Sequence, residues 1–353
     1  MESVMADKID HLIYRATQRA RTAWYSAHYA AAMRLAPKLD KPPTGELPGW
    51  RIIYEDLEAL QRRDWRNVQD GLYPAPEPGG GNFARAARRS VSFFRDLHNV
   101  NRRRVEANGN EVFDPELGAR YPRYYLQNFH YQSGGYLTSD SANLYDHQVE
   151  VLFIGGADAM RRQALGALSR HLRVHPMEGT GHLDIACGTG RFLEILKEAH
   201  PRMRVTGIDL SHPYLKTARR SLKPWSRVRL LQANAEALPF PDASFGSLSC
   251  VFLFHELPQK IRPVVAKEIA RILRPGGRLY FLDSMQLGDR PDYDALLDRF
   301  PIAFHEPYYR DFIRTDLTCL FEEVGLSVKT SDRVFFAKLL VVEKSSRSAP
   351  VIT

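Results

Sequence analysis

The hydrophobic pattern of the second half of the chain predicts short buried strands, each followed by a turn and a helix. Apolar residues dominate 183–186 and 203–211, and further strands are expected at 228–232, 247–252 and 279–282. The Leu-Arg-Pro-Gly-Gly stretch at 273–277 reads as a turn that ends a helix before the last of these strands. The pattern closes with a helix and two strands, joined by 331–333, at 311–324, 326–330 and 334–343.

The first 175 residues follow a different pattern, in which apolar side chains recur at helical spacing. Apolar residues from Ile9 to Leu35 form one stripe and predict a helix over 8–36, which Pro37 ends. That stripe can pack on the rest of the protein or lie on a membrane surface, so peripheral membrane contact stays open. Further helices are expected at 54–70, 83–96, 139–153 and 157–172, with a proline- and glycine-rich linker and loop at 42–49 and 73–81.

Residues 120–147 are crowded with aromatic side chains, among them six tyrosines. Gly134 and Gly135 break this stretch, and the helix that follows is expected to have Ser139 or Asp140 as its cap. A tyrosine offers flat apolar contact together with a hydroxyl group that can orient a ligand. The stretch therefore fits the lining of a substrate pocket, and it fits a packing surface or an oligomer interface equally well.

Composition adds limits to this picture. The chain has 353 residues with 44% hydrophobic residues, enough for a buried core, and no apolar run long enough for a transmembrane helix. The net charge is +8, but the basic surplus is spread along the chain, which disfavours a nucleic-acid partner. Three scattered cysteines show no metal spacing, so no metal is expected and a reducing cytoplasm fits best.

The most informative chemistry lies at the first predicted turn. Gly188 and Gly190 remove Cβ where a ligand and a helix must approach the backbone closely. The helix after the turn offers free N–H groups, and Asp209 ends the next strand, where an acid can accept both hydroxyls of a ribose. These residues together predict a binding site for a nucleotide-like ligand.

The ordered series of motifs over about residues 180–345 closely resembles the class I S-adenosylmethionine-dependent methyltransferases. The glycine turn, Asp209, the pair Asn234-Ala235, the Pro-Phe-Pro-Asp-Ala-Ser-Phe run at 239–245 and the turn at 273–277 occur in family order. Ala186 stands at the first glycine position of the family turn. The resemblance implies a Rossmann-like α/β fold whose seven-stranded sheet has the order 3-2-1-4-5-7-6 with strand 7 antiparallel. It also implies S-adenosylmethionine as the cofactor.

The resemblance implies roles for individual residues as well. Asp184 and the amides around Gly188 and Gly190 would hold the amino-acid end of the cofactor, and Asp209 would hold the ribose. Where many relatives have Asp this chain has Asn234, whose side-chain carbonyl still accepts a hydrogen bond from an adenine amino group. The other residues expected around the cofactor are Ala186, Leu210, Ala235 and Phe252.

Methyl transfer from a sulfonium needs an aligned acceptor in a dry site, and a general base only where the acceptor still holds its proton. His255 and Glu256 follow the fourth strand, at the edge of the sheet where ligands lie, and are the expected catalytic residues. His255 fits a structural or water-holding role as well. Five residues are expected on the acceptor side from their region alone: Tyr131, Tyr145, His305, Tyr308 and Tyr309.

These expectations combine into one reading of the whole chain. A mainly helical region (1–138) and a helical lid or connection (139–178) precede a methyltransferase core (179–345) with an acceptor-side insertion at 285–310, and 346–353 form a frayed tail. The expected activity is methyl transfer to an oxygen or carbon atom, less so nitrogen, of a small aromatic or lipophilic acceptor. Two alternatives stay open: a nucleic-acid or protein methyltransferase that docks through its N-terminal region, and a non-catalytic cofactor-binding partner protein. The sequence leaves the acceptor and the oligomeric state undetermined.

Overall fold

The computed structural model describes residues 2–37, 45–77, 83–175 and 181–346. Its centre is one seven-stranded sheet with the order β3-β2-β1-β4-β5-β7-β6. β1 to β5 pair in parallel, and β7 runs antiparallel to both β5 and β6. The predicted sheet is therefore confirmed. The strands are β1 His182–Ile185, β2 Val205–Asp209, β3 Val228–Gln232, β4 Phe245–Val251, β5 Leu273–Ser284, β6 Leu326–Val334 and β7 Ala337–Lys344.

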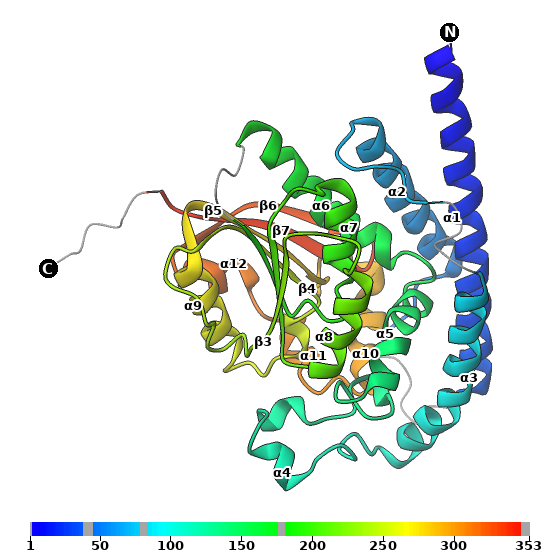
Figure 1. Cartoon of the computed structure of the whole chain (residues 1–353). Coiled ribbons are helices and arrows are strands. Elements are labelled where there is room, and N and C mark those ends of the chain that lie inside the picture. The colour runs from blue at the N-terminus through cyan, green and yellow to red at the C-terminus, as the bar shows by residue number, and fades with distance from the viewer. Residues whose placement is uncertain (1, 38–44, 78–82, 176–180, 347–353) are drawn as a thin grey trace, which may run out of the picture.

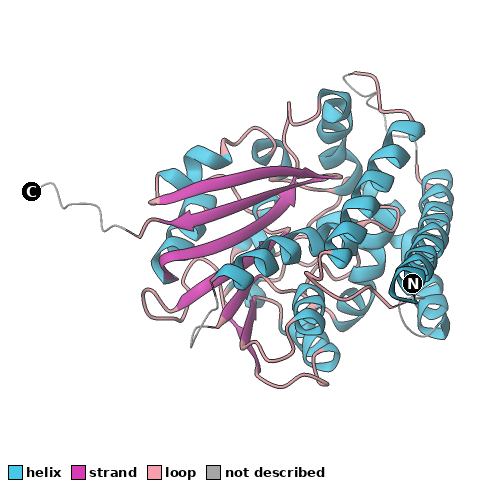
Figure 2. Ribbon diagram, turned by 90° about the horizontal axis from the view of Figure 1, so that it is seen from above, coloured by secondary structure: helices cyan, strands magenta, loops and turns pink. Residues whose placement is uncertain are grey.

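Helices cover both faces of this sheet, with α7 and α8 on one side and α9 and α12 on the other (Figures 1 and 2). The long N-terminal helices α1 and α3 run side by side along the edge of the molecule remote from the C-terminus (Figure 1). No helix in the described residues is both long and apolar enough to cross a membrane. The α-helices are α1 Glu2–Leu35, α2 Trp50–Gln69, α3 Phe83–Glu106, α4 Pro115–Gly118, α5 Ser139–Leu152, α6 Ala157–Val174, α7 Arg191–Ala199, α8 His212–Ser221, α9 Arg262–Ile272, α10 Asp294–Phe304, α11 Tyr309–Phe312 and α12 Leu317–Glu322. Short 3-10 helices occur at η1 Arg123–Tyr125, η2 Phe129–Tyr131, η3 Phe254–Glu256 and η4 Pro291–Tyr293.

Several element boundaries correct the sequence predictions. The cap of α5 is Thr138, whose side chain accepts a hydrogen bond from the Ser141 amide, and neither Ser139 nor Asp140 has that role. α3 continues ten residues past the predicted end, to Glu106. The single helix expected at 311–324 is two helices, because Asp316 accepts hydrogen bonds from the first amides of α12 and so starts a new helix.

The strand predictions at the antiparallel edge also needed correction. The stretch 273–277 belongs to β5 itself, where the pairing with β4 shifts register. β6 continues through 331–333, the residues expected to form the turn, and the connection to β7 is Phe335-Phe336. The predicted linker at 42–49 and the loop at 73–81 fall partly, and the tail at 346–353 almost wholly, outside the described residues.

A buried polar cluster fastens α1 and α2 to α6. Asp64 of α2 is fully buried and accepts two hydrogen bonds from the Arg162 guanidinium, at 2.8 and 2.7 Å. The hydroxyls of Tyr14 and Tyr73 donate to the same carboxylate, at 2.7 and 2.8 Å. A buried charge persists in a folded protein when it is paired and its lone pairs are satisfied, as they are here. The cluster therefore holds the N-terminal helices against the methyltransferase-like core.

Candidate functional site

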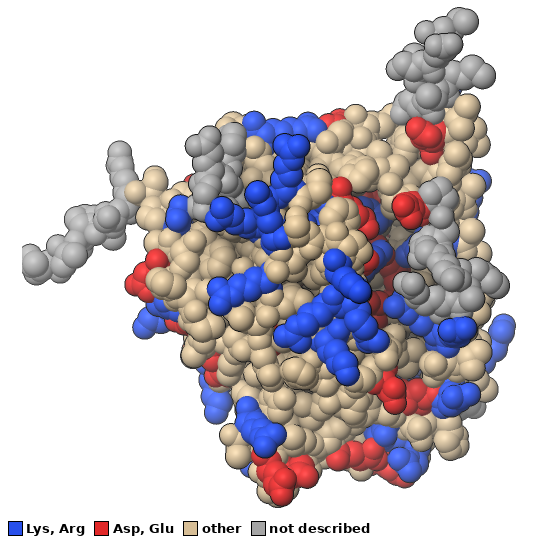
Figure 3. Space-filling view, viewed as in Figure 1, with Lys and Arg blue, Asp and Glu red and all other residues tan. Residues whose placement is uncertain are grey.

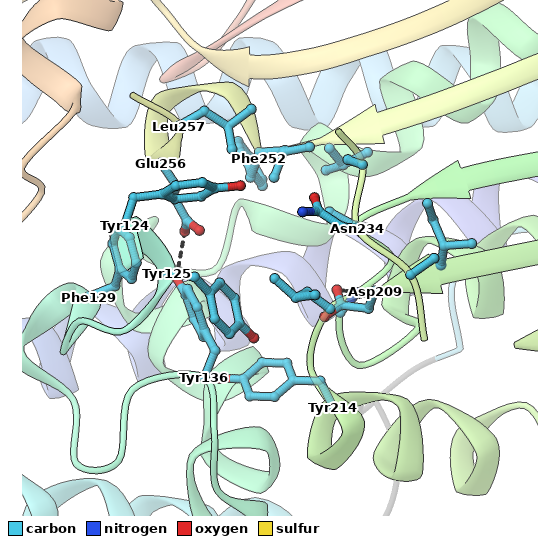
Figure 4. A pocket seen from close by; sticks show the side chains of 18 of the residues that line it. Tyr124, Tyr125, Phe129, Tyr136, Asp209, Tyr214, Asn234, Phe252, Glu256 and Leu257 are labelled. Atoms are coloured by element: carbon cyan, nitrogen blue, oxygen red, sulfur yellow. Dashed lines mark hydrogen bonds between the residues drawn. The ribbon is translucent and has the colours of Figure 1, made fainter. Parts of the chain in front are cut away.

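A cavity of about 100 Å³, here named cavity A, lies at the carboxyl ends of β1, β2 and β4 (Figure 4). This is the edge at which parallel α/β sheets bind ligands. Aromatic side chains cover it from the outside, and these five are named the tyrosine roof: Tyr124, Tyr125, Phe129, Tyr136 and Tyr145. The sheet side of the cavity is formed by Ala186, Gly188, Ile208, Asp209, Leu210, Ala233, Asn234, Ala235, Val251, Phe252, Leu253, Glu256 and Leu257.

The two glycines of the turn after β1 have different functions. At Gly188, with φ +54°, an added Cβ would meet nothing closer than Tyr214 Cδ1 at 3.9 Å, so this face of the turn is open toward cavity A. At Gly190, with φ +81°, an added Cβ would lie 3.0 Å from the Ala218 Cβ of α8. Gly190 is therefore required for the close packing of α7 against α8, and it does not line the cavity.

Asp209 lies where the sequence predicts an acid, at the end of β2 and in the wall of cavity A. Its carboxylate accepts hydrogen bonds from the amides of Gly188 at 2.8 Å and Ser211 at 2.7 Å. Burial raises the pKa of Asp209 to about 6, against these hydrogen bonds that lower it. A buried carboxylate anchored in this way can still accept hydroxyl groups of a ligand through its remaining lone pairs.

Asp184 lies farther from the cavity than its predicted role suggests. The side chain is buried beside β4 and accepts a hydrogen bond from the Ser249 hydroxyl at 2.5 Å. Burial raises the pKa of Asp184 to about 7. It is absent from the lining of cavity A, so contact with a cofactor stays a prediction for Asp184 and for Gly190.

A second cavity of about 340 Å³, cavity B, adjoins cavity A and shares Tyr145, Phe252 and Glu256 with it. Its walls are mostly apolar, and they come from α1, α2, α5 and α10 as well as from the core. The polar members are His130, His255, Glu256, Ser284 and the phenol groups of Tyr29, Tyr145 and Tyr309. Its other members are Leu47, Pro48, Trp50, Ile53, Val149, Leu152, Phe153, Ile154, Phe252, Leu296, Leu297, Phe300, Phe304 and Phe336.

The two expected catalytic residues lie at the junction of the cavities but differ in charge. His255 Nδ1 lies 2.6 Å from the buried Asp283 carboxylate, which raises the pKa of His255 to about 9 despite the burial that lowers it. The Tyr136 hydroxyl donates a hydrogen bond of 2.5 Å to Glu256 Oε1 (Figure 4). Burial raises the pKa of Glu256 to about 7. At neutral pH, His255 is therefore protonated while Glu256 can exchange a proton.

The structure separates the five residues expected on the acceptor side. Tyr145 and Tyr309 line cavity B. Tyr131 and His305 pack on each other, with ring centroids 5.2 Å apart, and line neither cavity. The Tyr308 hydroxyl accepts a hydrogen bond from Gln127 at 2.7 Å, and this side chain faces a separate surface groove.

Some residues at the two cavities were missed from the sequence. Asp283 near the end of β5 could have been found from the sequence, because it is an acid that follows the apolar residues of a strand, as Asp209 does in β2. Trp50 and Ile53 had no such signal, because α2 begins at Trp50, four residues before the predicted start at 54, and a sequence pattern does not indicate which distant cavity a residue faces.

Comparisons with known proteins identify a methyltransferase domain in this chain. A family model described as a methyltransferase domain matches residues 183–277. The demethylmenaquinone methyltransferase of Lysinibacillus sphaericus is 32% identical over 141 residues, which are 40% of this chain and 58% of that protein. The protein of the same name from Thermus thermophilus is 40% identical over 102 residues, 29% of this chain and 46% of that protein. The chain thus spans about half the length of the curated relatives it matches.

A solved structure described as a SAM-dependent methyltransferase from Aquifex aeolicus aligns with 47% of this chain and 82% of its own, at 21% identity and a TM-score of 0.37. The residues of cavity A fit S-adenosylmethionine, the cofactor that the sequence motifs imply. Three groups line this one cavity: the Asp209 carboxylate, the Asn234 amide and the turn at Gly188, which has no blocking Cβ. They suit the ribose, the adenine and the amino-acid end of that cofactor.

Proposed function

Because this chain carries the core of a class I S-adenosylmethionine-dependent methyltransferase, we propose that it methylates an oxygen or carbon atom of a small lipophilic acceptor. One observation carries the proposal: cavity A, with the cofactor-type residues, adjoins the larger, mostly apolar cavity B, and the two share three lining residues. Methyl transfer needs two ligands that meet in a site without water. The names of the relatives, which are demethylmenaquinone methyltransferases, support an acceptor of this lipophilic kind.

In this proposal the residues of cavity A hold S-adenosylmethionine, which supplies a methyl group activated by a positive sulfur. Asp209 binds the ribose hydroxyls, and Asn234 with the Ala235 amide binds the adenine, which Leu210 contacts. Asp184 and the turn at Gly188 and Gly190 receive the amino-acid end of the cofactor, and Gly190 also allows the close packing of α7 against α8.

We assign the proton transfer to Glu256. When the acceptor is a hydroxyl compound, its proton must leave as the oxygen takes up the methyl group that the cofactor would supply. His255 already holds its proton at neutral pH, whereas Glu256 has a pKa of about 7 and lines both cavities. Glu256 therefore takes the proton, and protonated His255, oriented by Asp283, stabilises the negative charge that develops on the acceptor oxygen.

One observation favours a second function, methylation of a nucleic acid. A surface groove of about 960 Å³ between α3, α5 and α8 is lined by Arg88, Arg89, Arg95 and Arg220. Figure 3 shows basic side chains gathered on this face, over α8. Asp96 and Asp140 line the same groove and reduce its positive charge, so the apolar cavity B remains the better guide to the acceptor.

Transfer of a labelled methyl group distinguishes the two functions. The purified protein is incubated with S-adenosylmethionine labelled in the methyl group and, separately, with a lipophilic cell extract, total RNA, DNA and a protein extract. We expect label in the lipophilic extract only, and none with an Asp209→Ala variant. Label in RNA, DNA or protein alone would overturn the proposed acceptor class while leaving the methyltransferase assignment intact.

A further inference from the structure

Cavity B contains a second histidine–carboxylate pair besides His255 and Asp283. His130 of η2 lines the cavity, and its Nδ1 lies 3.3 Å from Oε1 of Glu306, in the segment after α10. The Glu306 side chain is completely buried, whereas the His130 side chain keeps 21% of its surface exposed. The pair thus has the arrangement of an orienting acid behind a ring that faces the cavity.

The contacts of this pair leave one hydrogen-bonding atom for a ligand. The Nδ1 contact is close but poorly aligned, and neither Glu306 oxygen has another hydrogen-bond partner among the described residues. Burial raises the pKa of Glu306 well above its usual range and lowers the pKa of His130 to about 3. Both groups are therefore neutral at pH 7. When the Glu306 proton faces Nδ1, the ring proton of His130 lies on Nε2, which is then an N–H donor. No described residue accepts a hydrogen bond from this Nε2.

The backbone at His130 is in a strained conformation. His130 and Tyr131 both have φ +56°, in the left-handed region that residues other than glycine rarely adopt. Surrounding hydrogen bonds maintain it: the Asn128 side chain donates to the Gln132 carbonyl at 2.9 Å, and Arg103 donates to the Tyr131 carbonyl at 3.1 Å. Strain that is maintained in this way is concentrated at functional sites.

We propose that His130 donates a hydrogen bond from Nε2 to a second oxygen atom of the acceptor. This rests on the proposed function, because cavity B must hold the acceptor. Glu256 and His255 receive the oxygen that is methylated, and His130, another polar residue in the wall of the same cavity, orients the molecule. The acceptor class is then a lipophilic aromatic compound with two oxygen substituents, and His130 is a specificity-determining residue.

Ligand binding tests this directly in the native protein. Dissociation constants are measured for the naphthols and for a panel of dihydroxynaphthalenes and aminonaphthols. The titrations contain S-adenosylhomocysteine and are kept free of molecular oxygen. At least one diol should bind roughly tenfold more tightly than the naphthol that shares its first hydroxyl. Replacing the second hydroxyl by an amino group should remove much of this gain, since an N–H donor needs an acceptor opposite it. Naphthols that bind as tightly as every diol would overturn the proposal without the need for a variant.

Two variants assign the effect to this residue. His130→Phe keeps a ring of similar size but no donor, and should lower the affinity for the diols to that for the naphthols, while S-adenosylhomocysteine binding in cavity A reports that the variant is folded. His130→Asn keeps a donor and tolerates a positive φ, and should retain part of the preference. A preference for diols that survives in His130→Phe would contradict the role of His130. If the native protein did not bind S-adenosylhomocysteine, the proposed function itself would be contradicted.

Discussion

At the residue scale, the junction between the two cavities is a place where burial and charge assign different tasks to neighbouring side chains. His255 and Glu256 are adjacent in sequence, yet only His255 contacts the buried Asp283 carboxylate. That contact keeps His255 protonated, while Glu256, hydrogen-bonded by a neutral phenol, titrates near pH 7. The division of tasks between acid and base follows from these two environments.

Replacing Glu256 tests this division. Glu256→Gln should lower kcat by about 10²- to 10⁴-fold for a hydroxyl acceptor, the usual contribution of a general base. Since a carboxyl with a pKa of about 7 accepts a proton only above that pH, native kcat should rise with pH through about 7. The variant should lack that rise, and steady-state rates from pH 5.5 to 8.5 would measure both. A variant with the same pH-dependent rise would contradict the assignment.

Tyr136→Phe provides a matched control for the same profile. The Tyr136 hydroxyl donates to the Glu256 carboxylate and so stabilises its charged form. Without that bond the pKa of Glu256 increases, and the rise in kcat should move to higher pH without disappearing.

At this scale the sequence grouped Asp209, Asn234 and Phe252, and all three line cavity A, because the end of a parallel strand has a known position. Their contact with a cofactor stays a prediction. The position of Asp184 could not be predicted, because its direction depends on Ser249 in a neighbouring strand. Tyr131 and His305 were chosen by region, and their mutual packing was not readable from a single sequence.

At the element scale, α2 is fastened to α6 by charge rather than by apolar contact alone. Asp64→Ala would leave the buried Arg162 without its partner and would remove the nearer of two acceptors from the hydroxyls of Tyr14 and Tyr73. We expect a loss of about 3–5 kcal/mol in the free energy of unfolding, measured with denaturant. Glu58→Ala on the same helix, which breaks an exposed pair with Arg62, should change it by less than about 1 kcal/mol. Equal effects of the two variants would refute the anchoring role.

The tyrosine roof should move when the cofactor binds. Cavity A has a free volume of about 100 Å³, whereas ligand pockets usually measure about 300–1,000 Å³. Gly134 and Gly135 directly precede Tyr136 of the roof. Both have positive φ and can absorb a change of backbone conformation. We expect S-adenosylhomocysteine to slow amide hydrogen exchange over residues 121–136 and to leave α9 unchanged. Unaltered exchange in 121–136 under saturating ligand would show that the roof is rigid.

Element positions were more predictable than their ends. The periodic apolar residues of α1, α2 and α6 predicted that these helices exist, because a continuous apolar stripe is a strong signal. The ends depended on single contacts, such as the Thr138 cap and the Asp316 cap that separates α11 from α12. Propensity alone does not reveal which of several neighbouring polar residues forms a cap.

At the scale of the whole molecule, the N-terminal helices complete the wall of cavity B. Asp56 of α2 forms ion pairs with Arg290 and Arg333, which lie more than 230 residues later in the chain. Tyr29, Trp50 and Ile53 then contribute to the wall of cavity B. The core fold could be predicted because its motifs are local, whereas this docking rests on contacts between distant segments, which a single sequence does not show. We therefore propose that residues 1–138 select the acceptor while the core holds the cofactor.

The central claim is that cavity A binds S-adenosylmethionine through Asp209. Titration calorimetry with S-adenosylhomocysteine tests it on the native protein, on Asp209→Ala and on Asp242→Ala, a matched change at a largely exposed aspartate. The account predicts binding by the native protein and by Asp242→Ala, and at least about a 100-fold weaker affinity for Asp209→Ala, the loss of two hydrogen bonds to a charged group. Equal affinities of Asp209→Ala and the native protein, or no binding by a folded native protein, would contradict it.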